Sequence, residues 1–137
     1  MNQEIQNKYV ELQLLNQQIK QIQEQFLILQ QQLTELINIE TSLTELKDVK
    51  KNNEMFSPIG SGIFVSSTIK DNDLVIVNVG AGVLIEKTVD EAKKLVQSQM
   101  ENINKSIEIA KEQFAKASTF SEELTAEIQA MMQNEKK

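Results

Sequence analysis

The chain lacks several residue types on which common protein chemistries depend. Its 137 residues include no cysteine, histidine, arginine or tryptophan, so all 14 basic residues are lysines. The missing cysteine and histidine exclude disulfide bonds, thiol chemistry and the common nitrogen and sulfur metal sites. No side chain titrates near neutral pH, and no nucleophile lies in a recognisable catalytic motif. We therefore expect no enzyme, no metal site and no cofactor.

The charge and hydropathy of the chain argue against two further kinds of partner. The formal net charge is −6 and the pI is about 4.8. A nucleic-acid-binding protein normally carries a basic stripe, and arginine supplies most bidentate phosphate and guanine contacts. No long apolar run occurs, and residues 1–4 lack the basic start of a signal peptide. We therefore expect a cytoplasmic protein that binds neither nucleic acid nor a membrane.

Glycine is scarce and confined to one short stretch. All four glycines fall in two copies of an internal repeat, Ile59–Ile69 and Val79–Val89, which place Gly-x-Gly between short runs of aliphatic and β-branched residues. This pattern predicts two tight hairpins with positive φ at one or both glycines. We expect four strands, near residues 55–60, 62–69, 74–79 and 82–87.

Two features of this stretch resemble ligand-binding sites. The Gly-x-Gly segments superficially resemble phosphate-binding loops, but neither continues to a third glycine or to Gly-Lys-Ser/Thr, and each precedes a strand. Asp71 and Asp73 could bind a hard cation, yet no EF-hand spacing follows them. Hairpin turns and a solvated connector are the preferred interpretation.

The predicted strands are too apolar for a small sheet in water. In Leu74–Val79 both alternating faces are almost wholly apolar, whereas a lone antiparallel sheet presents one polar face to solvent. Such a small sheet is also marginal and has open edges. The second face must be covered by another chain or by the chain's own helices folding back, and we favour oligomerisation. The residues expected at subunit contacts are Ile59, Ile63, Val65, Leu74, Ile76, Val77, Val79, Val83 and Ile85.

The first fifty residues repeat in sevens. With Ile5 at heptad position a, apolar residues occupy a and d without interruption through Leu12–Leu36. A seam of more than three heptads favours a coiled coil over an ordinary amphipathic helix. Lys8, at a d position, and Glu40, at an a position, depart from it. Residues 50–53, Lys-Lys-Asn-Asn, predict the helix end.

A second helix is predicted from the capping-box signature of Thr88 and Glu91. With Met100 at a, its seam runs from Val96 to Met131 and only Ser121 is polar. Each helix has about 45 residues and spans roughly 65 to 70 Å, so the two can pair as an antiparallel coiled coil. The sequence thus predicts a mainly α, α+β subunit with three parts: a coiled-coil helix at 1–53, two β-hairpins at 54–88 and a coiled-coil helix at 89–137.

The apolar stripe broadens towards the helix ends that carry the two termini. Phe120 and Met132 flank the seam there, and methionine adapts its packing to different partners. Ordinary seam packing explains Leu12, Leu124 and Ile128 equally well, but an exposed surface fits Phe120 and Met132 better. The candidate binding residues are Tyr9, Val10, Leu12, Leu14, Phe120, Leu124, Ile128, Met131 and Met132.

Two blocks between the helices carry a family resemblance. Ser57–Gly62 and Val77–Val83, followed by Glu86-Lys87 and the helix opening at 89–92, resemble the alpha-class subunit of prefoldin, also called GimC. The resemblance covers nearly the whole chain, and two hairpins fit the alpha class because the beta class has one. Many Lys, Asn and Ile residues without arginine indicate an AT-rich and, we expect, archaeal genome.

The resemblance implies an ATP-independent holdase. In this family two alpha and four beta subunits form a hexamer, and their hairpins build a double β-barrel that would cover the apolar strands. The coiled-coil tips hold non-native polypeptides by hydrophobic contact and pass them to a group II chaperonin. The family has no strict residue motif at the tips, so only this location carries over to the candidate binding residues. The alternative is a structural or filament-forming coiled-coil protein that uses the same β-module.

Overall fold

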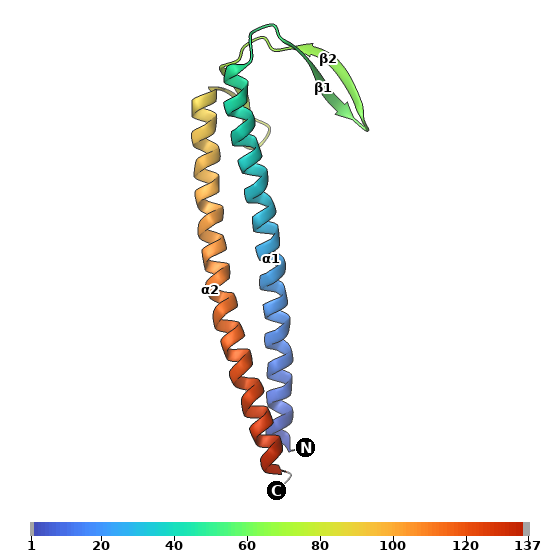
Figure 1. Cartoon of the computed structure of the whole chain (residues 1–137), viewed down its shortest axis with the longest axis vertical. Helices are drawn as coiled ribbons and strands as arrows, with labels where there is room; N and C mark the ends of the chain where they lie inside the picture. Colours follow the sequence, from blue (N-terminus) through green and yellow to red (C-terminus); the bar gives the residue numbers. More distant parts are fainter. Residues whose placement is uncertain (1, 136–137) are drawn as a thin grey trace. The chain divides into compact units, whose positions relative to one another are not determined.

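The computed structural model describes residues 2–135 and contains two long helices with two β-hairpins between them. Figure 1 shows the helices side by side and antiparallel. The mainly α fold class predicted from the sequence is confirmed. The elements, in chain order, are α1 (Gln3–Asp48), β1 (Glu54–Gly60), β2 (Ile63–Thr68), β3 (Leu74–Asn78), β4 (Leu84–Thr88) and α2 (Val89–Glu135).

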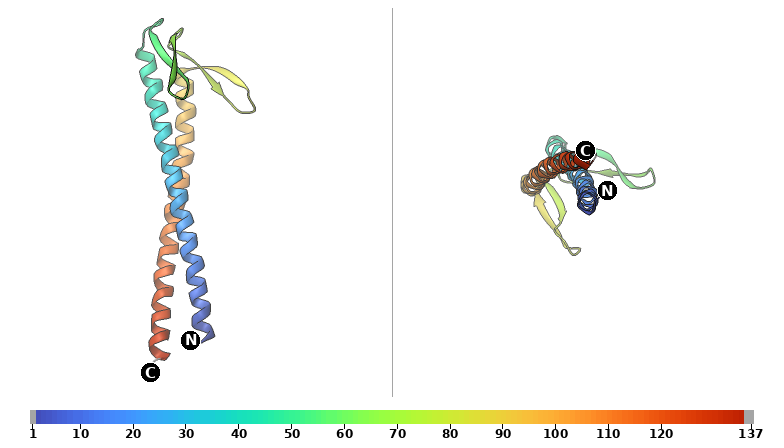
Figure 2. Two further views of the ribbon diagram at one scale, coloured as in Figure 1. Left: turned by 90° about the vertical axis from the view of Figure 1, so that its right-hand side faces the viewer. Right: turned by 90° about the horizontal axis from the view of Figure 1, so that it is seen from below.

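The chain divides into two packed units. The first combines α1 up to Leu33 with α2 from Ile103 onwards, and the second is Thr34–Asn102. The first unit is therefore purely helical, and the second contains both hairpins. The views in Figure 2 agree that the helices of the first unit lie against each other.

The helices pack along the predicted heptad seam. Between Ile5 and Leu43 of α1, every buried or half-buried residue lies at an a or d position. These residues include Lys8 and Glu40, the two polar residues of the seam. The predicted seam positions of α2 are likewise buried or half-buried, except Phe114, which is 37% exposed. The seven-residue period therefore identifies the packed face of each helix, because this face recurs every two turns.

Each hairpin forms its own two-stranded antiparallel sheet. The strand bounds lie within two residues of those predicted. Both glycines of each turn have positive φ, as expected, with Gly60 at 128° and Gly80 at 113°. The middle residues Ser61 and Ala81 also have positive φ, which the sequence interpretation missed. All three central residues of each loop are thus held in conformations that tighten the turn.

The first helix ends earlier than predicted. It stops at Asp48, whereas the sequence placed its end within residues 50–53. The side-chain amide of Asn72 donates hydrogen bonds to the carbonyl oxygens of Lys47 at 3.1 Å and Val49 at 2.9 Å. These carbonyls lack partners within the helix, so a residue of the connector between the hairpins caps it.

The predicted capping box at the start of α2 is confirmed. The backbone amide of Glu91 donates to Thr88 Oγ1 at 3.1 Å, and the amide of Thr88 donates to Glu91 Oε1 at 3.3 Å. Hydrogen bonds from the Thr88 side chain and backbone hold the pKa of the Glu91 carboxyl below its usual value. Lys47 Nζ, at the end of α1, donates to Asp90 Oδ1 at 2.6 Å and lowers the pKa of Asp90.

Candidate functional site

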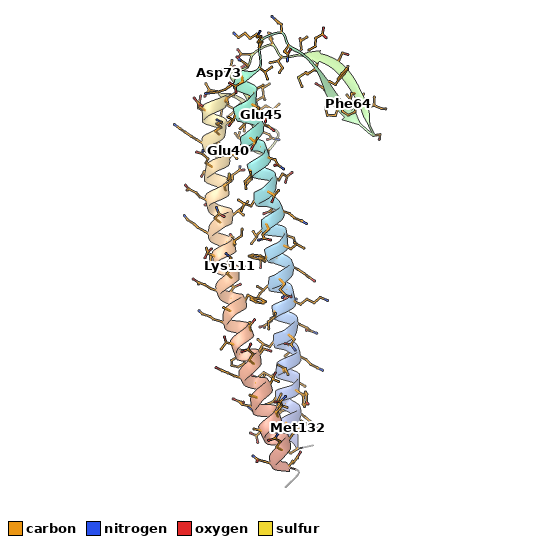
Figure 3. The ribbon with its side chains drawn as sticks, in the orientation of Figure 1. Glu40, Glu45, Phe64, Asp73, Lys111 and Met132 are labelled. Atoms are coloured by element: carbon orange, nitrogen blue, oxygen red, sulfur yellow. The ribbon has the colours of Figure 1, made fainter. Side chains whose placement is uncertain are left out.

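The candidate binding residues surround one end of the helix pair, here called the tip and comprising Gln3–Asn16 of α1 and Phe120–Glu135 of α2. Its centre is a buried cluster of Ile5, Leu124 and Ile128, which are 0%, 4% and 3% exposed. Partly buried Leu12, Met131 and Met132 pack against this cluster. Figure 3 labels Met132 near the end of α2.

Apart from the half-buried Leu12, Met131 and Met132, the candidate residues form a buried group and an exposed group. Leu124 and Ile128 occupy d and a positions that face α1, so their side chains are closed to a ligand while the helices are paired. Of the two explanations that the sequence left open for these residues, the structure supports seam packing. A direct contact between them and a polypeptide stays a prediction, and it requires the helix ends to separate.

The second group is open to solvent. Val10 is 55% exposed, Leu14 is 56% exposed and Phe120 is 47% exposed. Tyr9 is also exposed, and its hydroxyl donates to Met132 Sδ at 3.5 Å. These apolar and aromatic side chains lie around a packed core, so they form the part of the predicted surface that another molecule can reach without unfolding the tip.

Polar contacts join the two helices at the tip. Lys8 occupies a seam position, and its Nζ donates to Glu127 Oε2 at 2.7 Å. This hydrogen bond is the main reason that the pKa of Lys8 is raised. The polar seam residue Ser121 donates from Oγ to Asn16 Oδ1 at 3.2 Å. Two polar departures from the heptad pattern thus have partners on the opposite helix, and such pairs favour one helix register.

Asn2, just before α1, makes contacts to both helices at the end of the tip. The side chain of Asn2 caps α1 by accepting from the amide of Ile5 at 2.9 Å, and its backbone amide donates to Glu135 Oε1 at 3.1 Å. The sequence interpretation did not identify this cap, although asparagine two or three residues before an apolar seam is a common start signal.

The hairpins carry the predicted assembly residues on their surface. All of them are exposed except Val77, which is half-buried, and Ile59 and Ile76 are each 70% exposed. Within Thr34–Asn102 the helix segments therefore do not cover the strands, which favours oligomerisation over the other explanation left open by the sequence. Four exposed apolar strand residues were missed: Met55, Phe56, Phe64 and Leu84.

Strand register shows that both faces of the first hairpin are apolar. Pro58 lies opposite Phe64, and Phe56 is two residues along the same strand, so these three side chains share one face. Ile63 and Val65 lie on the other face by alternation. The two-residue period of the sequence could have identified Phe56 and Phe64. Figure 3 labels Phe64 on this hairpin.

The second hairpin repeats the arrangement. Val77 lies opposite Ile85 on one face, while Ile76 and Leu84 belong to the other. A two-stranded sheet that exposes apolar side chains on both faces is unstable in water, because neither face is buried against another element. This surface is therefore suited to contact with further strands.

The connector between the hairpins uses its carboxylates locally. Asp71 Oδ1 accepts from the backbone amides of Asp73 at 2.8 Å and Leu74 at 3.3 Å. These hydrogen bonds lower the pKa of Asp71. Within residues 2–135 no group of three potential ligands is placed to hold a metal ion, and no helix is long and apolar enough to cross a membrane.

Comparison with known proteins connects this geometry to one family. The family model described as prefoldin subunit matches residues 15–134. The prefoldin subunit alpha of Methanococcus aeolicus is 31% identical over 135 residues, covering 96% of this chain and 92% of the relative.

Two solved structures have the same fold. A filamentous prefoldin from Methanocaldococcus jannaschii is similar with a TM-score of 0.56 at 21% identity, covering 93% of this chain and 99% of that one. The prefoldin beta subunit from Thermococcus strain KS-1 is similar with a TM-score of 0.62 at 18% identity, covering 95% and 93%.

Proposed function

The chain belongs to the prefoldin family, as a chaperone subunit of the alpha class, and on that premise we propose that its tip captures non-native polypeptides. Capture uses hydrophobic contact and no ATP. The subunit works in a cytoplasmic hexamer of two alpha and four beta chains, which delivers the captured polypeptide to a group II chaperonin. Prefoldins are not enzymes, and nothing in this proposal requires bond-making chemistry.

The observation that carries the proposal is the exposed apolar group Val10, Leu14 and Phe120 around a closed core. Unfolded polypeptides expose apolar side chains, and burial of apolar surface is favourable at about 25 cal/mol per Å² without any directional requirement. A surface of separate aliphatic and aromatic side chains can therefore bind many sequences weakly. Met131 and Met132 beside it add side chains that repack easily.

Assembly is the second part of the proposal. The exposed strands support pairing with beta subunits, because their apolar faces would be covered by neighbouring hairpins. The isolated chain should consequently self-associate, and addition of a beta subunit should replace the aggregates with one defined complex. Light scattering coupled to size exclusion measures both states. A stable 15.6 kDa species at micromolar concentration would contradict this part.

Capture is tested with the assembled complex. A denatured model protein is diluted into buffer with the complex, and its aggregation is followed by light scattering. We expect the complex to suppress aggregation, and a variant with Val10→Ser, Leu14→Ser and Phe120→Ser to suppress it much less. Ile109→Ser is the matched control, since Ile109 is also 55% exposed but lies outside the tip.

Two outcomes would overturn capture at the tip. One is full suppression by the triple variant after the beta-subunit tips have also been trimmed, which removes compensation by those arms. The other is an equal loss with Ile109→Ser. A structural or filament-forming role predicts ordered assemblies by electron microscopy with no suppression of aggregation, so the same samples distinguish the two functions.

A further inference from the structure

A groove opens along the helix seam of the first unit, away from the tip. Its volume is about 280 Å³. It spans successive a and d layers of both helices together with one flanking e position on each. The residues that line it are Ile22, Gln23 and Phe26 of α1 and Ala110, Lys111 and Phe114 of α2.

The groove exists because a small side chain occupies a core position. Ala110 is 3% exposed at a d position, where it contributes only a methyl group. Phe114, at the following a position, is 37% exposed and is the one exposed seam residue of α2 in the described chain. A larger residue at position 110 would fill the space, as leucine does at other d positions.

The size and lining of the groove indicate the apolar part of a ligand. An apolar cavity of about 150 Å³ is known to bind benzene. The present groove has nearly twice that volume, and Ile22, Phe26, Ala110 and Phe114 supply apolar walls. Because one side is open, a ligand with two fused rings can enter without separating the helices.

The rim of the groove indicates a negative charge on that ligand. Lys111 is the only charged lining residue, and its side chain is 58% exposed. Its Nζ pairs with Glu108 Oε1 at 3.6 Å, three residues earlier on the same exposed helix face. Such surface pairs contribute little, so the ammonium group remains able to pair with an incoming anion. Figure 3 labels Lys111 on α2.

We propose that this groove binds a small amphiphilic anion, with two fused rings against Phe26 and Phe114 and a sulfonate or carboxylate beside Lys111. Gln23 lines the groove from α1, and its side-chain amide supplies a second hydrogen-bond donor for an anion there. This site is independent of polypeptide capture at the tip, because none of its lining residues belongs to the tip.

The test uses two probes that share one ring system. Anilinonaphthalene sulfonate carries the anion, and phenyl-naphthylamine is its uncharged parent. Both are titrated into the complex assembled with beta subunits, in which only this chain carries labelled isoleucine methyl groups. Binding in the groove should shift the methyl resonance of Ile22 and leave that of Ile5 in the tip core unchanged. Binding to the hairpins instead shifts Ile59, Ile63 or Ile76, so the two locations are resolved.

Three variants decide the result. Ala110→Leu fills the groove and should weaken binding of both probes at Ile22 by about tenfold or more. Lys111→Gln should weaken the sulfonate probe about two- to fivefold, the range of an exposed ion pair, and leave the neutral probe unchanged. Ala117→Leu, at the next d position outside the groove, is the control and should bind both probes normally.

Each remaining outcome counts against the proposal. Shifts confined to hairpin isoleucines would show that the groove is not a site. An Ile22 shift that persists in Ala110→Leu would also overturn it, provided that thermal unfolding shows this variant to be at least as stable as the parent. Equal effects of Lys111→Gln on both probes would show that Lys111 does not recognise the negative charge of the ligand.

Discussion

Truncation of Leu124 should loosen the tip, whereas truncation of its exposed neighbour Phe120 should not. Leu124 is 4% exposed and packs with Ile5 and Ile128. Leu→Ala changes in protein cores cost about 2 to 5 kcal/mol, with the lower values where the surroundings can collapse into the gap. A helix end can collapse in this way, so we expect a cost of about 2.5 kcal/mol for Leu124→Ala. Phe120 is 47% exposed, and Phe120→Ala should cost less than about 1 kcal/mol.

This difference has a measurable consequence for amide exchange. A cost of about 2.5 kcal/mol raises the population of locally opened tip roughly 60-fold, since 1.4 kcal/mol corresponds to a factor of ten. Hydrogen exchange measured by mass spectrometry should therefore show roughly 60-fold faster exchange at residues 5–14 and 121–132 in Leu124→Ala. Peptides from Thr34–Asn102 should be unchanged and serve as an internal reference.

Phe120→Ala is the matched control for this experiment. Its exchange pattern should follow the parent chain, while its capture of non-native polypeptide should fall. If Leu124→Ala leaves exchange at the tip unaltered, the buried cluster does not hold the two helices together. If Phe120→Ala accelerates exchange as much as Leu124→Ala, the division into packing and binding residues is wrong.

Three further predictions concern assembly, ionic strength and pH. Val77→Asp should prevent assembly with a beta subunit, because an unpaired buried charge costs several kcal/mol. Asn53→Asp adds the same charge at an exposed residue outside the strands and should assemble normally by size exclusion. Capture by apolar contacts should change little between low and moderate salt, unlike Coulombic contacts that are screened over about 8 Å, and loss of most activity on adding salt would contradict this. The pKa values of Asp90 and Glu91 are lowered by their partners, so their stabilisation of the start of α2 is complete above the ordinary value of 4.5 for Glu91 and is lost as the pH falls through the lowered values. Thermal unfolding across this range should show a smaller pH dependence in Asp90→Asn than in the parent chain.

Much of the fold is encoded in patterns that span only a few residues. Heptads identify the seam because seven residues make two helical turns, and the Gly-x-Gly repeats identify the turns because glycine accepts positive φ. The capping box of Thr88 and Glu91 is likewise read within four residues. Even Lys8 and Glu40 lie on the seam where the period places them, although neither is apolar.

Contacts between distant segments decided what these patterns left open. The end of α1 depends on the Asn72 side chain, which follows the helix by more than twenty residues. Lys8 is accommodated because Glu127 reaches it from the other helix, an arrangement that the sequence pattern did not reveal.

The sequence by itself determined which residues form the seam, the turns and the apolar strands, since each depends on local periodicity and backbone preference. Only the tertiary structure decided which residues meet across the seam, such as Ile5 with Leu124 and Ile128, and Lys8 with Glu127. The heptad period gives the packed face of each helix but does not give the partner of each residue on the other helix. Those partners are set by the register between two helices whose paired residues lie more than one hundred positions apart, as the bond between Asn16 and Ser121 illustrates.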